Sequence, residues 1–68
     1  MTTRIAKIVD RHIDGDGEHR IYVKLEDTGE YDHFYVTAAQ YYEQFAVGDR
    51  IRITDPGIFS DNVYEKIT

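Results

Sequence analysis

Apolar and polar residues alternate along most of this chain, and a period of two predicts β-strands. The pattern is clearest in residues 19–26, where Ile21, Val23 and Leu25 share one face while charged residues and a tyrosine share the other. Strands of this kind turn one face to a core and the other to solvent. The predicted strands cover residues 4–13, 19–26, 31–37, 49–54 and 63–67.

The first predicted strand changes its parity halfway along. Ala6 and Ile8 share one face, whereas Val9 and Ile13 share the other. One explanation is that the strand is covered on both faces, which is difficult in 68 residues. The other is that a bulge near Ile8 and Val9 turns the side chains of Val9 and Ile13 toward the same core as Ala6 and Ile8. We favour the bulge, because a long and bent first strand lets a small sheet close into a barrel.

Turns separate the predicted strands. Residues 14–18 (DGDGE) and 55–57 (DPG) have turn-forming compositions, and Gly29 supplies the left-handed residue of a hairpin turn at 27–30. If Thr28 and Gly29 form a two-residue loop, apolar residues oppose apolar ones across the hairpin, whereas a longer turn would shift this register. The expected pairs are Val23–Phe34, Ile21–Val36, Tyr22–Tyr35 and Lys24–His33.

The period changes after the third strand. Thr37 and Gln40 have the spacing of a capping box, in which each side chain bonds the backbone of the other residue. Apolar residues then follow at helical spacing, which predicts a short helix over residues 38–45 that ends near Gly48. Two turns of helix are not stable alone, so Phe45 and one of two tyrosines, Tyr41 or Tyr42, should close the end of the barrel.

The predicted fold is mainly β: one domain over residues 1–68, formed as a small five-stranded barrel with one short helix between strands three and four. This order matches the connectivity of an OB-like barrel, and an SH3-like barrel is the alternative. Residues 5–54, with Val9-Asp10-Arg11 and Val47-Gly48-Asp49-Arg50, resemble small bacterial or phage β-barrel domains of unknown function. The resemblance implies a β-barrel fold, but it implies no catalytic activity and no binding site.

Composition narrows the functional classes. The chain has no cysteine, which excludes disulfides, thiolate metal sites and thiol catalysis, and favours a reducing compartment. The sequence after Met1 lacks the apolar run of a signal peptide, and no stretch approaches the ~20 apolar residues of a membrane span. We therefore expect a cytoplasmic protein that has no membrane partner.

The acidic residues are concentrated in one part of the chain. Residues 10–32 hold eight acids and three bases, which accounts for the whole net charge of −5. An acidic protein repels phosphates at long range, so generic nucleic-acid binding is disfavoured. Mimicry of DNA is also disfavoured, because the two acidic turns should lie at opposite ends of the second strand and not in one stripe.

Candidate catalytic and metal-binding patterns fail on inspection. The 14–18 turn places carboxylates as in a calcium loop, but His19 and Leu25 occupy the positions where that loop needs Gly and Glu. The three histidines (His12, His19 and His33) lack zinc-ligand spacing, and the one serine, Ser60, lies in no nucleophile motif. We predict a non-enzyme that uses no metal and no cofactor.

The best candidate surface is the outward face of strands two and three. Tyrosine and arginine are enriched in protein interfaces, so our first hypothesis is a module that binds a protein partner. The alternative is single-stranded nucleic-acid binding by base stacking over a basic groove. A simpler reading is that tyrosine is a good strand former whose rings cover neighbouring side chains. The candidate binding residues are Arg20, Tyr22, Lys24, Tyr31, His33, Tyr35, Arg50 and Arg52.

A second possible contact is the loop at Ile58 and Phe59, which we expect instead to fold as a flap over the mouth of the barrel. The oligomeric state stays open, because an exposed edge strand permits pairing between copies.

Overall fold

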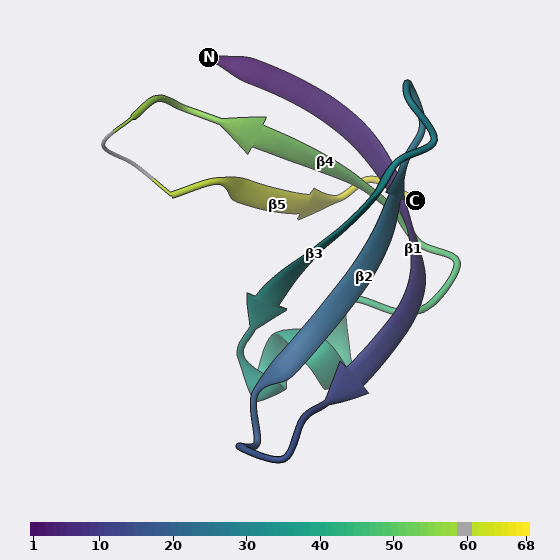
Figure 1. Cartoon of the computed structure of the whole chain (residues 1–68), viewed down its shortest axis with the longest axis vertical. Coiled ribbons are helices and arrows are strands. Elements are labelled where there is room, and N and C mark those ends of the chain that lie inside the picture. The colour runs from purple at the N-terminus through teal and green to yellow at the C-terminus, as the bar shows by residue number, and fades with distance from the viewer. Residues whose placement is uncertain (59–60) are drawn as a thin grey trace.

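The computed structural model describes residues 1–58 and 61–68. Five strands form one antiparallel sheet in the order β3-β2-β1-β4-β5 (Figure 1). The mainly β prediction with five strands and one short helical piece is confirmed. The elements are β1 (Thr2–Ile13), β2 (His19–Leu25), β3 (Tyr31–Val36), the π-helical turn η1 (Gln40–Gln44), β4 (Arg50–Asp55) and β5 (Val63–Lys66).

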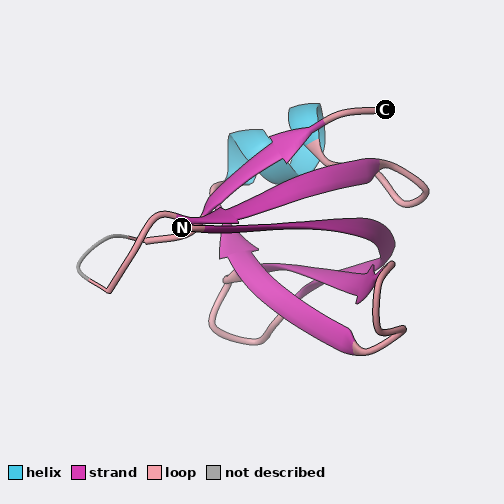
Figure 2. Cartoon of the chain, turned by 90° about the horizontal axis from the view of Figure 1, so that it is seen from above, coloured by secondary structure: helices cyan, strands magenta, loops and turns pink. Residues whose placement is uncertain are grey.

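The sheet is strongly coiled but not closed. β1 lies in the middle, with the β2–β3 hairpin on one side and the β4–β5 hairpin on the other (Figure 2). Within the described residues no backbone ladder joins the two edge strands, β3 and β5. The predicted closed barrel is therefore not confirmed.

The predicted bulge in β1 is confirmed. Ile8 pairs with Val23 but Asp10 pairs with Tyr22, so Val9 has no partner in the ladder. The bulge does not turn the second apolar set into the core, because Val9 and Ile13 both stay exposed. The residue paired with the buried Ile21 after the bulge is Arg11, which is half-buried. A charged residue thus enters the edge of the core.

The register predicted for the β2–β3 hairpin is wrong by two residues. Ile21 pairs with Phe34 and Val23 with Asp32. The turn is longer than two residues, since Gly29 N–H donates to Leu25 O and Leu25 N–H donates to Glu30 O, both at 2.8 Å. A shift of two keeps every side chain on its predicted face.

The capping box at the helical turn is confirmed. Thr37 N–H donates to Gln40 Oε1 at 2.9 Å, and Gln40 N–H donates to Thr37 Oγ1 at 3.2 Å. The turn that follows is wide, with Phe45 N–H donating to Gln40 O at 3.0 Å. Tyr41 and Phe45 are buried and Tyr42 is exposed, so Tyr41 is the tyrosine that enters the core. In the described part of the chain, no helix has the length and apolar character needed to cross a membrane.

Arg11 attaches the helical turn to β1. Its Nη1 donates to Tyr41 O and, at 2.9 Å, to Phe45 O, and its guanidinium lies 4.4 Å from the centre of the Tyr41 ring. The last carbonyls of a helical turn have no partner inside the turn, so a cation there satisfies them. This contact gives the half-buried Arg11 side chain a structural role.

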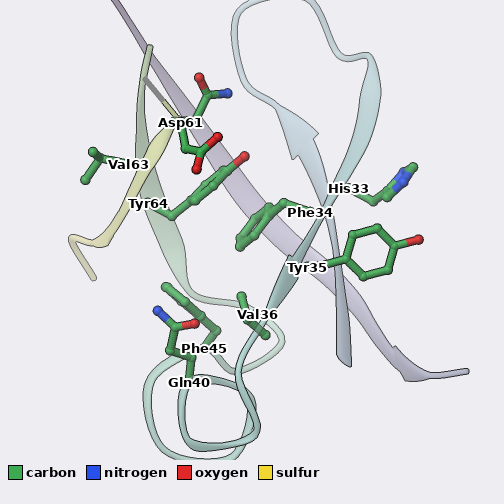
Figure 3. Close-up of a pocket in the computed structure, with 10 residues that line it drawn as sticks. His33, Phe34, Tyr35, Val36, Gln40, Phe45, Asp61, Val63 and Tyr64 are labelled. Atoms are coloured by element: carbon green, nitrogen blue, oxygen red, sulfur yellow. The ribbon is translucent and has the colours of Figure 1, made fainter. Parts of the chain in front are cut away.

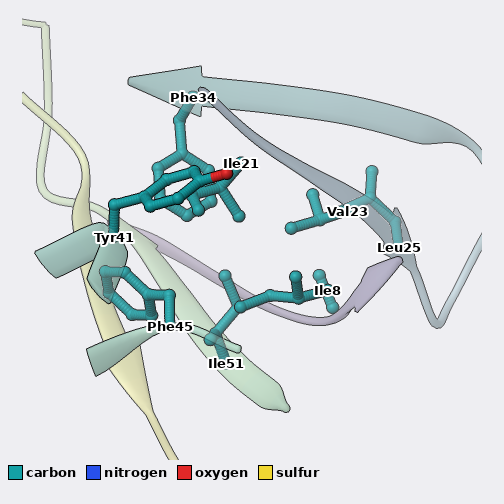
Figure 4. Packing of buried hydrophobic residues seen from close by; sticks show 9 residues of the cluster. Ile8, Ile21, Val23, Leu25, Phe34, Tyr41, Phe45 and Ile51 are labelled. Atoms are coloured by element: carbon teal, nitrogen blue, oxygen red, sulfur yellow. The ribbon is translucent and has the colours of Figure 1, made fainter. Parts of the chain in front are cut away.

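The core lies inside the curve of the sheet and is closed at one end by η1 (Figure 4). Val36, Ile53 and Tyr64 pack against it and are half-buried. The buried residues come from every strand except β5: Ala6, Ile8, Ile21, Val23, Leu25, Phe34, Tyr41, Phe45 and Ile51.

Candidate interaction surface

The outward sides of β2 and β3 carry a group of aromatic and basic side chains, here named the tyrosine face. Arg20 is its centre: Nη1 donates to Tyr22 Oη at 3.0 Å and Nη2 donates to Tyr35 Oη. The guanidinium carbon also lies 4.9 Å from the centre of the Tyr35 ring. The tyrosine face comprises Arg20, Tyr22, Lys24, Tyr31, His33 and Tyr35.

His33 joins the two tyrosines of this cluster. Its ring centre lies 6.0 Å from that of Tyr22 and 5.9 Å from that of Tyr35, the latter in an edge-to-face arrangement. The observed register places His33 directly opposite Tyr22, where the predicted register placed Tyr35. The rings therefore form a continuous aromatic surface along the hairpin.

The remaining two members extend the tyrosine face toward the hairpin turn. Lys24 Nζ lies 5.7 Å from the centre of the Tyr31 ring, directly across the strand pair. Tyr31 is 71% exposed and Tyr35 is 49% exposed. Large rings with this exposure can contact a partner without any rearrangement of the core.

The charge of Arg20 is already engaged. Its guanidinium lies 3.7 Å from the Asp14 carboxylate, and hydrogen bonds to Tyr22 and then Tyr35 raise the pKa of Arg20 above its ordinary value. Three groups of this chain, Asp14, Tyr22 and Tyr35, therefore hold the Arg20 side chain in place. Its structural role is to fix the two tyrosine rings.

Arg50 and Arg52, the other two predicted binding residues, are on β4. Arg50 lies in a cross-strand row with Lys7 and Lys24, because Lys7 pairs with both. Arg52 pairs with Ile5 and Glu65 instead, away from the tyrosine face. The structure therefore gathers six of the eight predicted residues, links Arg50 to them through Lys7, and leaves Arg52 apart.

Arg50 forms a two-pronged ion pair with Glu26, the residue directly after β2. Its Nε donates to Glu26 Oε2 at 2.7 Å and its Nη2 donates to Glu26 Oε1 at 3.0 Å. These hydrogen bonds lower the pKa of the Glu26 carboxyl group. Lys7, which lies between the two elements, has the parity of an outward-facing position but was not singled out in the sequence.

A groove separates the two edge strands of the sheet (Figure 3). Its volume is 810 Å³, and its floor includes Phe34 of β3 stacked on Tyr64 of β5, with ring centres 3.8 Å apart and planes 10° from parallel. No sequence pattern indicated this groove, because the two rings are thirty positions apart. The lining residues are His33, Phe34, Tyr35, Val36, Gln40, Phe45, Asp61, Asn62, Val63 and Tyr64.

The acidic first turn has a structural explanation. Asp14 Oδ1 accepts the backbone N–H groups of Asp16 at 3.0 Å and Glu18 at 3.1 Å, so this carboxylate shapes the turn. His12 pairs with Arg20, while His19 packs its ring against Tyr41. Across residues 1–58 and 61–68, no three His, Asp or Glu side chains are close enough to hold a metal ion.

The predicted flap is not formed by Ile58, which is 91% exposed. The preceding Gly57 has a φ of 142°, and its N–H donates to Asp55 Oδ1 at 3.1 Å. Phe59, the other half of that prediction, and Ser60 lie outside the described residues.

Comparison with known proteins gives no relative from which a function could be inferred: no family model, no curated protein and no solved structure matches this chain. Its function is therefore inferred from the tyrosine face and the groove.

Proposed function

We propose that this protein is a small, non-catalytic interaction module that binds a protein partner through its tyrosine face. The observation that carries the proposal is the Arg20 clamp, which holds Tyr22 and Tyr35 by their hydroxyl groups. Rings fixed before binding lose little conformational entropy when a partner covers them. Tyrosine and arginine are also the residues that dominate the energetics of protein interfaces.

Charge favours a protein over a nucleic acid as the partner. Arg20 is paired with Asp14, Arg50 is paired with Glu26, and the whole chain carries −5. Binding of phosphates draws its free energy from unpaired cations that release counterions. We place the partner in the cytoplasm, because a cysteine-free composition favours a reducing compartment.

For the fold we propose an OB-like barrel left open between β3 and β5. The support is that β1 pairs with both β2 and β4, and that η1 lies between β3 and β4 and closes one end of the core. The stack of Phe34 on Tyr64 brings the two edges together through side chains, where a closed barrel would use a backbone ladder.

Single-stranded nucleic acid is the second candidate partner, and one observation favours it. Lys24, Lys7 and Arg50 form a basic row across three strands, and Tyr31 stands at its end. Bases stacked on exposed rings beside such a row are how OB-like barrels bind single strands.

An amide chemical-shift titration separates the two candidates. The labelled protein is titrated with a mixed-sequence single-stranded DNA of twelve nucleotides, first at low salt and then at physiological salt. We expect no shifts at physiological salt. Shifts that cluster on Lys7, Lys24 and Tyr31 and weaken as salt rises would replace the first candidate by the second.

The protein-partner proposal has its own test. Tagged wild type, Tyr35→Ser and Tyr42→Ser are used to capture proteins from the source cells, after circular dichroism has shown that all three fold. Tyr42 is the matched control, because it is exposed on η1 away from the tyrosine face. We expect a protein captured by the wild type and by Tyr42→Ser but lost with Tyr35→Ser. Equal capture by all three would contradict the proposal.

A further inference from the structure

A hollow of about 490 Å³ lies beside Lys24, at the end of the tyrosine face nearest the turn between β2 and β3. Two lysines line it, Lys7 from β1 and Lys24 from β2. The remaining lining residues are Val9, Leu25, Glu26 and Gly29. The hollow therefore combines two cations with apolar groups, and neither the core nor the Arg20 clamp uses it.

The two lysines repel each other. Lys7 lies directly opposite Lys24 in the β1–β2 ladder, and like charges in this position destabilise a sheet. Within residues 1–58 and 61–68 neither lysine forms an ion pair. The carboxylate beside them, Glu26, accepts hydrogen bonds from Arg50 on both of its oxygens. The free protein therefore carries a repulsion that an anion from outside would relieve.

The ammonium group of Lys24 is positioned by its neighbours. The Lys24 side chain passes over Gly29, where an added Cβ atom would lie 3.9 Å from Lys24 Cε. Its Nζ lies 5.7 Å from the centre of the Tyr31 ring. An aromatic ring attracts a cation without neutralising its charge, so Lys24 remains able to bind an anion.

The β1 bulge supplies an apolar wall of the hollow. Val9, which has no partner in the ladder, is 38% exposed and lines the hollow. The backbone just before it is fixed, because Ile8 N–H donates to Asp49 O and Gly48 N–H donates to Ile8 O, both at 2.8 Å. Bulges often re-aim a side chain beside a functional site. A valine exposed at a fixed bulge is consistent with contact to a partner.

We propose that this hollow binds a carboxylate side chain of the partner protein, from an aspartate or glutamate that lies next to an apolar residue. The carboxylate would lie between Lys7 and Lys24, and the apolar residue would pack against Val9. Opposite charges that meet across an interface give specificity and register. The inference rests on the proposed function, since it gives the chemistry of the partner at one end of the tyrosine face.

Neighbouring acids favour one carboxylate over a chain of phosphates. Glu26 lines the hollow, and the turn beside it carries Asp27 and Glu30. A nucleic acid has a negative charge at every nucleotide, so the phosphates beyond the hollow would meet these acids. A protein segment can present a single acid with neutral residues on both sides, and it avoids this repulsion.

The probe is a phage-displayed library of random twelve-residue peptides, selected on the wild-type protein. We expect the selected sequences to place an acid beside an apolar residue. One selected peptide is synthesised, and its Kd is measured by calorimetry for the wild type, Lys7→Gln, Lys24→Gln and Lys66→Gln, after circular dichroism has shown that all four fold. Lys66 is the matched control, because it lies on β5 and pairs with Asp49.

The two lysines of the hollow should contribute to affinity and the control lysine should not. We expect Lys7→Gln and Lys24→Gln each to raise the Kd at least about threefold, and Lys66→Gln to change it by less than about twofold. Equal binding by all four proteins would overturn the proposal. It is also overturned if no peptide binds with a Kd below about 1 mM, or if the selected peptides show no preference for acids.

A second peptide tests whether the lysines meet the carboxylate itself. In this peptide the acid is replaced by the corresponding amide, and the Kd is measured again for the wild type and Lys7→Gln. We expect the two proteins to bind the amide peptide equally, because the charge that Lys7 would meet is gone. If Lys7→Gln weakens both peptides by the same factor, the lysine acts through the structure of the sheet and the proposal is wrong.

The apolar wall has its own variant. Val9→Thr keeps the shape of the side chain but makes it polar, and we expect the Kd of the acidic peptide to rise about threefold. Val47→Thr is the matched control, because Val47 is exposed after η1 and does not line the hollow. An unchanged Kd in Val9→Thr would remove the apolar residue from the proposal.

Other outcomes separate this inference from the proposed function. Peptide binding that is lost in Tyr35→Ser but unchanged in Lys7→Gln and Lys24→Gln would support the tyrosine face and overturn the hollow. Weaker peptide binding in both lysine variants, together with unchanged partner capture by Tyr35→Ser, would do the reverse. A single-stranded DNA of twelve nucleotides that displaces the peptide at physiological salt, and binds more tightly, would overturn the carboxylate in favour of a phosphate.

Discussion

The middle of the sheet and its two edges are built from the same alternating pattern but have opposite properties. In the middle, where each strand has a neighbour on both sides, five side chains are 0% exposed: Ala6, Ile8, Ile21, Val23 and Ile51. On the edge strands only Phe34 is buried, while Tyr31, Tyr35 and Val63 are exposed. Burial therefore depends on how many strands flank a residue, and the pattern alone does not determine it.

The middle of the sheet and its edges therefore have different roles. The middle strands and η1 supply the stability, since they bury nearly all of the apolar surface. The edges supply the rings and the backbone groups that remain available to a partner. Substitutions in the two regions should therefore differ in what they change.

The largest effect is expected in the middle of the sheet. Ile8→Ala leaves a cavity at a fully buried site and should lower the free energy of unfolding by about 2–5 kcal/mol, measured by urea denaturation. If the alanine variant does not fold, Ile8→Val can be measured in its place, and its free energy of unfolding should fall by about 0.5–1.5 kcal/mol. Val63→Ala on the edge is the control, and a loss there as large as at Ile8 would contradict the comparison.

The second effect concerns the junction between β1 and η1. Arg11→Met keeps the length of the side chain but removes the donor to Tyr41 O and Phe45 O, so the free energy of unfolding should fall by about 1–3 kcal/mol. The Tyr41 ring signals in the NMR spectrum should also shift, because the guanidinium no longer covers the ring. Arg52→Met, exposed on β4, should change stability by less than about 0.5 kcal/mol.

The third effect measures how far side chains close the open edge. A double-mutant cycle with Phe34→Leu and Tyr64→Leu should give a coupling free energy of about 0.5–1.5 kcal/mol, as expected for stacked rings. A coupling near zero would mean that the edges are independent and that the sheet opens freely there.

The smallest effect comes from exposed ion pairs and appears as pH dependence. Arg50 lowers the pKa of Glu26, and Arg4 lowers the pKa of Asp27. Their stabilisation is therefore present above the ordinary carboxyl pKa and is lost as the pH falls through the lowered values. Unfolding by urea from pH 7 down to about pH 2 should show a shallower acid decline in Glu26→Gln than in wild type. High salt should reduce the difference, and Glu43→Gln, on the exposed side of η1, should leave the profile unchanged.

Local patterns were sufficient for much of the fold. The parity change in β1 predicted the bulge, although the second apolar set, Val9 and Ile13, stays exposed and does not join the core as expected. The spacing of Thr37 and Gln40 predicted the capping box, which involves only residues three apart. The hairpin register was wrong because it depends on the length of the turn, and sequence does not distinguish a two-residue loop from the longer one observed.

The interaction surface, like the fold, was predicted from the sequence only in part. The sequence by itself determined which side chains of β2 and β3 face outward, since the period of a strand fixes this parity even when the register shifts. Only the tertiary structure decided that Arg20 joins Tyr22 to Tyr35, that Lys7 links Lys24 to Arg50, and that Phe34 meets Tyr64 across an open groove. The physical reason is that the Arg20–Tyr35 contact depends on a hairpin register set by the length of the turn. The Lys7–Arg50 pair and the Phe34–Tyr64 stack join strands far apart in sequence, and the pairing and coiling of the whole sheet decide which of these meet.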